Sequence, residues 1–343
     1  MSLKQTVVDL AAEVGFQRCV VAALQPLPEA KSRYDAWLSR DFAADMDYLK
    51  RDSNFRTSPQ LLFPDARTAL VVSVSYYSPP PPHPGKQYGQ VAAYAVGLDY
   101  HVVLRARLKQ LQQKLERTLG RNLKGRAFTD DVALYEQALA ARSGLGFPGK
   151  NTLIIGPKLS GSYNFIAELF LDIDLDADEA YQGTCGQCFR CASACPTGAI
   201  VEPRTVDARL CISYLTIENK EGIPPDLRTK LGGWLFGCDI CQMVCPYNQA
   251  PPPTPWPEFQ PDAGVGHFVD LFDLLRIATQ EEFHARFVRF AIRRPKRRGL
   301  LRNALIVLGN QRPEGGEKEI LAFLDRESDP LLREHAAWAL AQY

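Results

Sequence analysis

Hydrophobic and polar positions follow two different rhythms over the first 175 residues. Leu3, Val7, Leu10, Ala11 and Val14 recur at helical spacing. Strand-like apolar runs lie at 19–24, 69–77, 91–96, 151–155 and 165–175, and helical stretches lie near 102–119 and after 131. Strands that alternate with helices around an apolar sheet are typical of α/β domains. We therefore expect residues 1–175 to form an α/β domain with a mostly buried sheet.

The pattern changes twice beyond that domain. Residues 176–250 hold most of the cysteines on segments too short for long helices, and residues 251–261 contain six prolines. Proline fits neither a helix interior nor a central strand, so 251–261 is predicted to be a linker. Residues 262–343 are helical throughout, with Thr279 to Glu282 as a capping box.

The C-terminal helices 300–308 and 331–340 share an apolar face and are separated by a third helix around 320–324. This spacing favours one or two units of a HEAT-like helical repeat. An ordinary helical bundle without a repeat is the alternative interpretation.

Composition adds that the chain is globular, with 46% apolar and 23% charged residues among 343. No apolar run approaches the roughly 18 residues of a membrane span. The N-terminal apolar stretch is interrupted by Asp9 and Glu13, which argues against a signal peptide. We expect a cytoplasmic protein without membrane contact, and a monomer.

Eight of the nine cysteines lie between 185 and 245, where a cytoplasmic protein would use them for metal binding or redox chemistry rather than disulfides. Cys185, Cys188, Cys191 and Cys195, followed by a proline, have the spacing of bacterial ferredoxins. In that pattern three thiolates hold one [4Fe-4S] cluster and the fourth reaches a second cluster. A structural zinc site is the alternative, but zinc sites usually use two separated Cys-x-x-Cys pairs.

The second cluster must then take its ligands from a second group of cysteines. Cys238, Cys241 and Cys245 form this group, but Leu235 stands where the regular pattern would place its first cysteine, and Cys211 is the remaining thiol. The sequence therefore predicts two ligand sets that use every thiol once: Cys185, Cys188, Cys191 and Cys245 for cluster one, and Cys195, Cys211, Cys238 and Cys241 for cluster two. Since no dinucleotide-binding glycine motif or P-loop is present, the electrons are expected to pass to a group in the N-terminal domain.

A run of positive charge lies in the C-terminal part. Nine Lys or Arg and no Asp or Glu occur between Phe283 and Pro313, while the rest of the chain has a formal charge of −8. A cationic surface on an otherwise acidic protein is typical of nucleic-acid binding, although a solvated helix face is the alternative. We expect the densest part to contact the polyanion: Arg293, Arg294, Lys296, Arg297 and Arg298.

Taken together, the ferredoxin pattern with its displaced Cys211, the α/β domain before it and the basic helical tail resemble the epoxyqueuosine reductase family over nearly the whole chain. The segments that carry the resemblance are 94–101, 144–151, 161–162, the first cysteine run, 211–218 and 236–241. The resemblance implies an N-terminal fold similar to reductive dehalogenases and nitroreductases, which binds cobalamin. It also implies reduction of epoxyqueuosine to queuosine at the wobble position of tRNAs with GUN anticodons, the last step of that modification, with electrons from an unidentified low-potential donor.

The same resemblance suggests residues for the site. Asp131 is the implied proton donor, at the end of a strand where a carboxyl can be shielded from water, and Asp130 beside it leaves the register ambiguous. Arg56, Asp131, Ile155 and Ser213 are the implied cobalamin contacts, with Ile155 and Ser213 acting through backbone groups.

Two other functions are consistent with parts of the sequence. One is a corrinoid iron-sulfur enzyme like the reductive dehalogenases, but those enzymes usually carry a twin-arginine signal. The other is a non-catalytic ferredoxin-like electron carrier, which would not need the long domain before the clusters.

Overall fold

The computed structural model describes residues 2–157 and 160–343. Its largest sheet has four strands in the order β1, β2, β7, β4, and every neighbouring pair is antiparallel. The strands are β1 (Arg18–Ala22), β2 (Thr68–Ser75), β4 (Gly125–Phe128) and β7 (Asn164–Leu171). All of β2 and nearly all of β7 are buried, which confirms the expected mostly buried sheet among helices.

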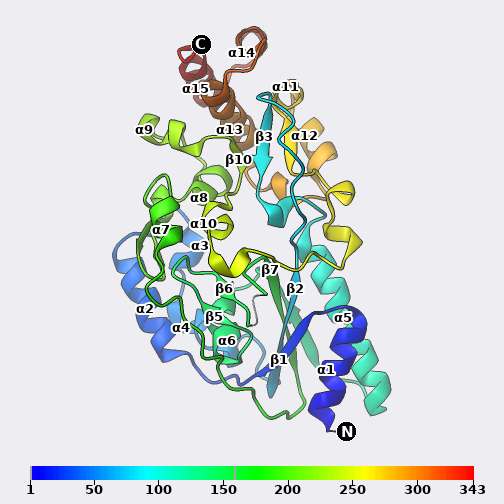
Figure 1. Cartoon of the computed structure of the whole chain (residues 1–343). Helices are drawn as coiled ribbons and strands as arrows, with labels where there is room; N and C mark the ends of the chain where they lie inside the picture. The colour runs from blue at the N-terminus through cyan, green and yellow to red at the C-terminus, as the bar shows by residue number, and fades with distance from the viewer. Residues whose placement is uncertain (1, 158–159) are drawn as a thin grey trace.

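Helices cover both faces of this sheet (Figure 1). On one face lie α1 (Leu3–Val14) and α5 (Tyr100–Leu119), and on the other lies α6 (Glu136–Arg142). Helix α1 begins where Ser2 accepts a hydrogen bond from the Gln5 N–H, and it ends at Gly15 in the left-handed conformation (φ 101°). Helix α2 (Pro28–Ser39) and the one-turn helices α3 (Asp47–Lys50) and α4 (Ser53–Arg56) follow β1.

A second sheet joins the regions that the sequence separates. Strand β3 (Tyr88–Val91) lies between β10 (Trp234–Phe236), which is parallel to it, and β11 (Phe268–Asp270), which is antiparallel. One strand thus comes from each of the ranges 1–175, 176–250 and 262–343. The three parts of the chain are consequently held together by backbone hydrogen bonds as well as by side-chain packing.

The proline-rich segment 251–261 packs tightly against the N-terminal domain. Trp256 and Phe259 are 3% and 2% exposed and belong to the same hydrophobic core as α1 and α5. The Trp256 indole N–H donates to the Gly15 carbonyl at 3.1 Å. The segment connects two regions, as expected, and it also fixes the second of them to the first.

The cysteine region consists of short elements, as its sequence predicts. Helices α7 (Arg190–Ala194) and α10 (Ile240–Met243) pack against each other. The remaining elements here are α8 (Ile212–Ile217), α9 (Pro225–Arg228) and the hairpin β8 (Ile200–Glu202) with β9 (Thr205–Val206). A further strand pair, β5 (Phe147–Pro148) and β6 (Ile154–Ile155), precedes β7 in the N-terminal domain.

The C-terminal part lies at the opposite end of the molecule from the N-terminus (Figure 1). It is helical except for β11, so the prediction that 262–343 is helical throughout is wrong at 268–270, where pairing with β3 makes a strand. Its helices are α11 (Leu271–Leu275), α12 (Gln280–Phe287), α13 (Lys296–Gln311), α14 (Gly316–Leu324) and α15 (Pro330–Leu340). Helix α13 is the centre of this part, because it is buried over residues 299–309 and packs against α11, α12 and α15. Thr279 caps α12 by accepting the Glu282 N–H, as predicted. The HEAT-like repeat relation stays a prediction.

Candidate redox site and its surroundings

The cluster-one cysteines are brought together from two distant parts of the sequence. Burial raises the pKa of both Cys191 and Cys245, and both thiols lie close enough to Cys185 for its charge to add to the rise. Cys188 acts on Cys245 in the same way. The four thiols assigned to cluster one therefore lie near one another, including Cys245 from the second cysteine group.

The second set of thiols shows the same relationship. Burial raises the pKa of Cys211, and the charge of Cys195 adds to it. Burial likewise raises the pKa of Cys238, with further contributions from Cys241 and Cys211. Cys211 is predicted to take the place of the cysteine that the regular pattern lacks at Leu235. It lies beside Cys195 and Cys238, with which it is expected to share cluster two.

A zinc ion and an iron-sulfur cluster use cysteines differently. A zinc ion holds its sulfur ligands at about 2.3 Å in a tetrahedron. Within residues 2–157 and 160–343, no three His, Cys, Asp or Glu side chains are arranged to share a single metal ion. The ferredoxin-like spacing of the cysteines along the sequence suits a multi-iron cluster, whose cysteine ligands bind different iron atoms.

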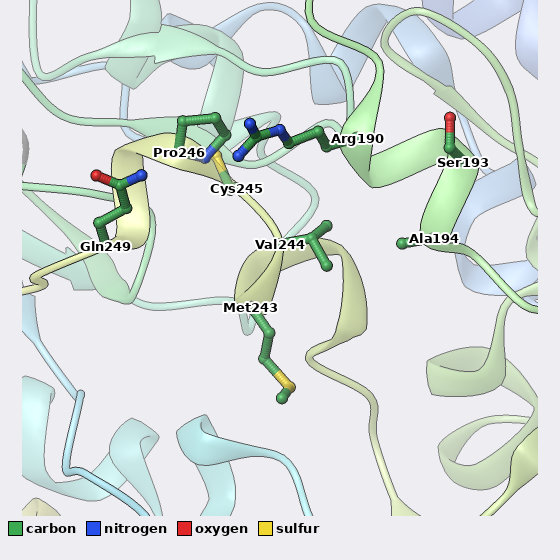
Figure 2. A pocket seen from close by; sticks show the side chains of 8 residues that line it. All are labelled: Arg190, Ser193, Ala194, Met243, Val244, Cys245, Pro246 and Gln249. Atoms are coloured by element: carbon green, nitrogen blue, oxygen red, sulfur yellow. The ribbon is translucent and has the colours of Figure 1, made fainter.

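A shallow surface cavity of about 550 Å³ lies between α7 and α10, beside Cys245, which the sequence assigns to cluster one. Figure 2 shows Arg190 extending toward Cys245 and Pro246, with Met243 on the α10 side. The Met243 side chain is 62% exposed, although it is apolar. The cavity is lined by Arg190, Ser193, Ala194, Met243, Val244, Cys245, Pro246 and Gln249.

The loop between β4 and α6 carries the two aspartates that the sequence singles out. Asp131 forms an ion pair with Arg105 of α5 and accepts the Thr129 N–H at 2.9 Å. Its side chain is 25% exposed, so the shielding expected at this strand end is incomplete. The expected proton donor is therefore held by a cation in this structure.

Asp130 has different surroundings. Its carboxylate accepts the Tyr100 hydroxyl at 2.6 Å, and its backbone is left-handed, with φ 54°. Burial raises the pKa of Tyr48 to about 12, and the charges of Glu218 and Asp130 contribute to this rise. Asp130 therefore faces the junction of the N-terminal domain with α8 and the C-terminal helices, where Arg294 donates to Glu218 at 2.9 Å.

The other residues predicted to contact cobalamin lie on separate elements. Arg56 ends α4 and is 9% exposed, and its Nε–H has no hydrogen-bond partner within the described part of the chain. Its guanidinium donates to the Tyr48 carbonyl at 3.3 Å and lies 5.7 Å from the Tyr34 ring centre. Ile155 is buried in β6, and Ser213 is half-buried in α8, two residues after Cys211. Their joint role stays a prediction.

Four of the five basic residues predicted to bind nucleic acid have carboxylate partners. The partners lie outside the basic run, which is why the sequence count did not reveal them. The pairs are Arg293 with Asp99 (3.2 Å), Arg294 with Glu218 (2.9 Å), Arg297 with Glu327 (2.7 Å) and Arg298 with Asp329 (2.8 Å). The exposed Lys296 has no such partner among the described residues. The free positive charge of this surface is thus smaller than the run suggests.

Sequence reasoning missed several residues near the site. Glu136 and Glu168 lie behind the aspartate loop, where Glu136 accepts the Asp130 backbone N–H. Asn151, from the turn between β5 and β6, lies beside the Cys241 thiol and counteracts part of the rise that burial causes in the pKa of Cys241. The sequence did offer one signal for Asn151: it lies in the segment 144–151, which carries part of the family resemblance.

No helix in the described part of the chain combines the length and apolar character that crossing a membrane requires.

Comparison with known proteins gives consistent matches along the whole chain. The family model "Epoxyqueuosine reductase QueG, DUF1730" matches residues 56–131, and the model "4Fe-4S double cluster binding domain" matches residues 184–248. An epoxyqueuosine reductase of Escherichia coli (strain K12) is 37% identical over 99% of this chain and 89% of its own length. An epoxyqueuosine reductase of Pseudomonas aeruginosa is 37% identical over 99% of this chain and 94% of its own length.

Solved structures agree with the sequence relatives. A crystal structure of epoxyqueuosine reductase with an epoxyqueuosine-modified tRNA-Tyr stem loop superposes with a TM-score of 0.90 at 30% identity, covering 99% of this chain and 90% of that one. A Bacillus subtilis epoxyqueuosine reductase, with the loop of its catalytic aspartate swung out of the active site, gives a TM-score of 0.88 at 29% identity over 99% of this chain and 90% of that one.

Proposed function

Because this chain belongs to the epoxyqueuosine reductase family, we propose that it reduces epoxyqueuosine to queuosine at the wobble position of tRNAs with GUN anticodons, as the last step of that modification. The observation that carries the proposal is similarity to this family along 99% of the chain, with eight cysteines grouped as two cluster sites. The reaction breaks the two C–O bonds of the epoxide and leaves a carbon–carbon double bond. Two electrons and two protons enter, and water leaves.

The two clusters supply the electrons one at a time. We place the entry point at cluster one, because the cavity between α7 and α10 lies beside its ligand Cys245 and has the exposed Met243 at its edge. Among the described residues that line it, Arg190 is the only charged one, which suits an acidic donor. The electrons then pass to cluster two and onward to the N-terminal domain.

Cobalamin is the proposed acceptor of these electrons, and when bound it supplies the strongly reducing cobalt chemistry that the epoxide requires. Its binding is supported by Arg56, a buried guanidinium whose unpaired Nε–H is an unsatisfied donor suited to a phosphate or amide oxygen. Ile155 and Ser213 are proposed to bind through backbone groups, and Asp131 to lie at the same edge. Arg56→Met should reduce retained corrin absorbance in anaerobically purified protein while the iron content stays unchanged.

The proton for the departing oxygen is proposed to come from the loop 129–132. Asp131, the donor that the sequence suggests, would have to exchange Arg105 for the substrate before it could act. We favour Asp130, because it faces Tyr100 and the junction with α8 and has no ion pair among the described residues. A movable loop is supported by the B. subtilis relative, in which the catalytic aspartate loop is swung out.

The tRNA is proposed to bind across the C-terminal helices next to this junction. Lys296 and Arg289 are the cations available for phosphates, because both are exposed and neither has a carboxylate partner in the described residues. Four arginines would also contact phosphates, either after they leave their carboxylate partners or while they are still paired: Arg293, Arg294, Arg297 and Arg298. A cytoplasmic, monomeric enzyme fits this substrate.

The test is reduction of an epoxyqueuosine-bearing anticodon stem-loop by the purified protein, supplied with cobalamin and a strong reductant. Formation of queuosine supports the proposal. Lack of product from protein that contains both clusters and corrin would overturn it.

A further inference from the structure

Glu168 is an ionisable residue in the middle of the four-stranded sheet. It lies on β7 between Ile166 and Phe170, and its neighbours across the sheet are Val71 and Phe128. The residue is 0% exposed. The apolar neighbours on this face make an unpaired carboxylate there very costly.

The partner of Glu168 is a second carboxyl group. Glu136, the first residue of α6, lies next to it, since each carboxyl group affects the pKa of the other, and no hydrogen-bond donor reaches either Glu168 oxygen within the described residues. Two adjacent buried carboxyl groups without a donor or a cation beside them do not both stay ionised. Burial raises the pKa of Glu136 to about 8, with the charge of Asp130 adding to the rise, and it raises the pKa of Glu168 well above its ordinary value. The pair therefore holds at least one proton at neutral pH.

This pair also holds the aspartate loop. Glu136 Oε1 accepts the Asp130 backbone N–H at 2.6 Å. Asp130 has φ 54°, a left-handed conformation that residues other than glycine adopt at a cost and that surrounding contacts must maintain. The chain of contacts runs from the sheet, through Glu168 and Glu136, to the backbone of the loop.

We propose that Glu136 and Glu168 are positioning residues, whose protonated pair fixes the backbone of Asp130 so that the loop presents its aspartate to the substrate. This inference rests on the proposed function, since it assigns the loop a role in that reaction. The charged groups that face the pair are Asp130 and Asp131 of the loop, and Arg105 of α5 neutralises Asp131. The side chains that β2 and β4 place around the pair are apolar.

The first test is amide hydrogen exchange at Asp130 in the cluster-loaded enzyme without tRNA. Glu136→Gln keeps an oxygen that accepts the Asp130 N–H, whereas Glu136→Ala removes it. We expect the protection of this amide to fall about tenfold or more in the Ala variant and to stay near wild type in the Gln variant. In wild type the protection should also decline at alkaline pH, once both carboxyl groups have lost their protons and repel each other. Glu168→Gln should abolish that decline.

The second test uses turnover of the modified stem-loop. The Ala variant should lose about tenfold or more in kcat with little change in KM, because the misplaced loop affects the chemical step, and the Gln variant should retain turnover. Unchanged amide protection in Glu136→Ala would overturn the inference. So would loss of turnover in Glu136→Gln with normal protection, because it would mean that the pair supplies a proton instead of a position. Failure of the wild type to act on tRNA would refute the proposed function, and the exchange result would still be readable.

Discussion

Arg297 and Glu327 form an ion pair in which both side chains are largely covered, with 16% and 9% of their surfaces exposed and 2.7 Å between charged atoms. Arg297 Nε also donates to the Ile277 carbonyl at 2.9 Å. The pair therefore connects the start of α13 with the segment before α12 and the turn before α15. A residue chosen from sequence as a tRNA contact is thus also part of the internal structure.

Replacing Arg297 with Ala should lower the free energy of unfolding by about 2 kcal/mol or more, since it leaves the covered Glu327 carboxylate without its cation. Lys296→Ala is the matched control, which should be nearly neutral in stability. The control variant should instead weaken stem-loop binding and reduce its salt dependence by about one counterion. Equal stability of the two variants in denaturant unfolding would contradict this assignment.

Iron content tests the ligand assignment. The wild-type protein should contain about eight irons and eight sulfides per chain, as expected for two [4Fe-4S] clusters. Cys211→Ser should reduce the iron content toward about four or change the electron paramagnetic resonance signal of one cluster only. Cys19→Ser is the control, because burial in β1 raises the pKa of Cys19 to about 12 and its thiol packs against the core. Four irons in the wild type would exclude the proposed second cluster.

Asparagine substitutions distinguish the two loop aspartates. Asp130→Asn should reduce turnover by at least about a hundredfold, because the amide cannot donate the proton, while clusters and corrin are retained. Asp131→Asn should keep most of the activity, since in this structure its carboxylate is engaged by Arg105. If the two variants give the opposite result in a single-turnover assay, Asp131 is the donor.

The buried carboxyl pair predicts a pH-dependent stability. Glu168 has a pKa raised by burial, so its contribution is fully present below about pH 4.5 and is lost as the pH rises through its folded-state value. Glu168→Gln removes the ionisable group, so it should leave Tm unchanged near pH 5. At pH 8.5 it should raise Tm by about 4 °C, which corresponds to about 2 kcal/mol. A constant difference in Tm at both pH values would show that the pair does not hold a proton.

Local sequence patterns predict much of this fold, but they do not show which charged residues pair with each other. Cys211 could be assigned because eight thiols had to fill two four-ligand sites, and Thr279 because capping is local. The partners of Arg293 and Arg294, Asp99 and Glu218, lie at least 76 residues away in sequence, and no local pattern indicates them. The antiparallel order of the main sheet is likewise set by long-range pairing.

Glu168 is a different case, because its signal was present. A single acidic residue within the apolar run 165–171 is unusual for a buried strand, since Glu is almost never fully buried without a partner. What the run could not show is that Glu136 is that partner. The choice between Asp130 and Asp131 also depended on the backbone conformation of the loop, which places their carboxylates on different neighbours.

The most direct measurement is an anaerobic assay of the purified protein on an anticodon stem-loop that bears epoxyqueuosine, with and without added cobalamin, read by mass spectrometry of the nucleosides. We predict queuosine, lighter by one oxygen atom, only in the reaction that contains cobalamin. An unchanged epoxide in protein shown to hold both clusters and corrin would contradict the proposed function.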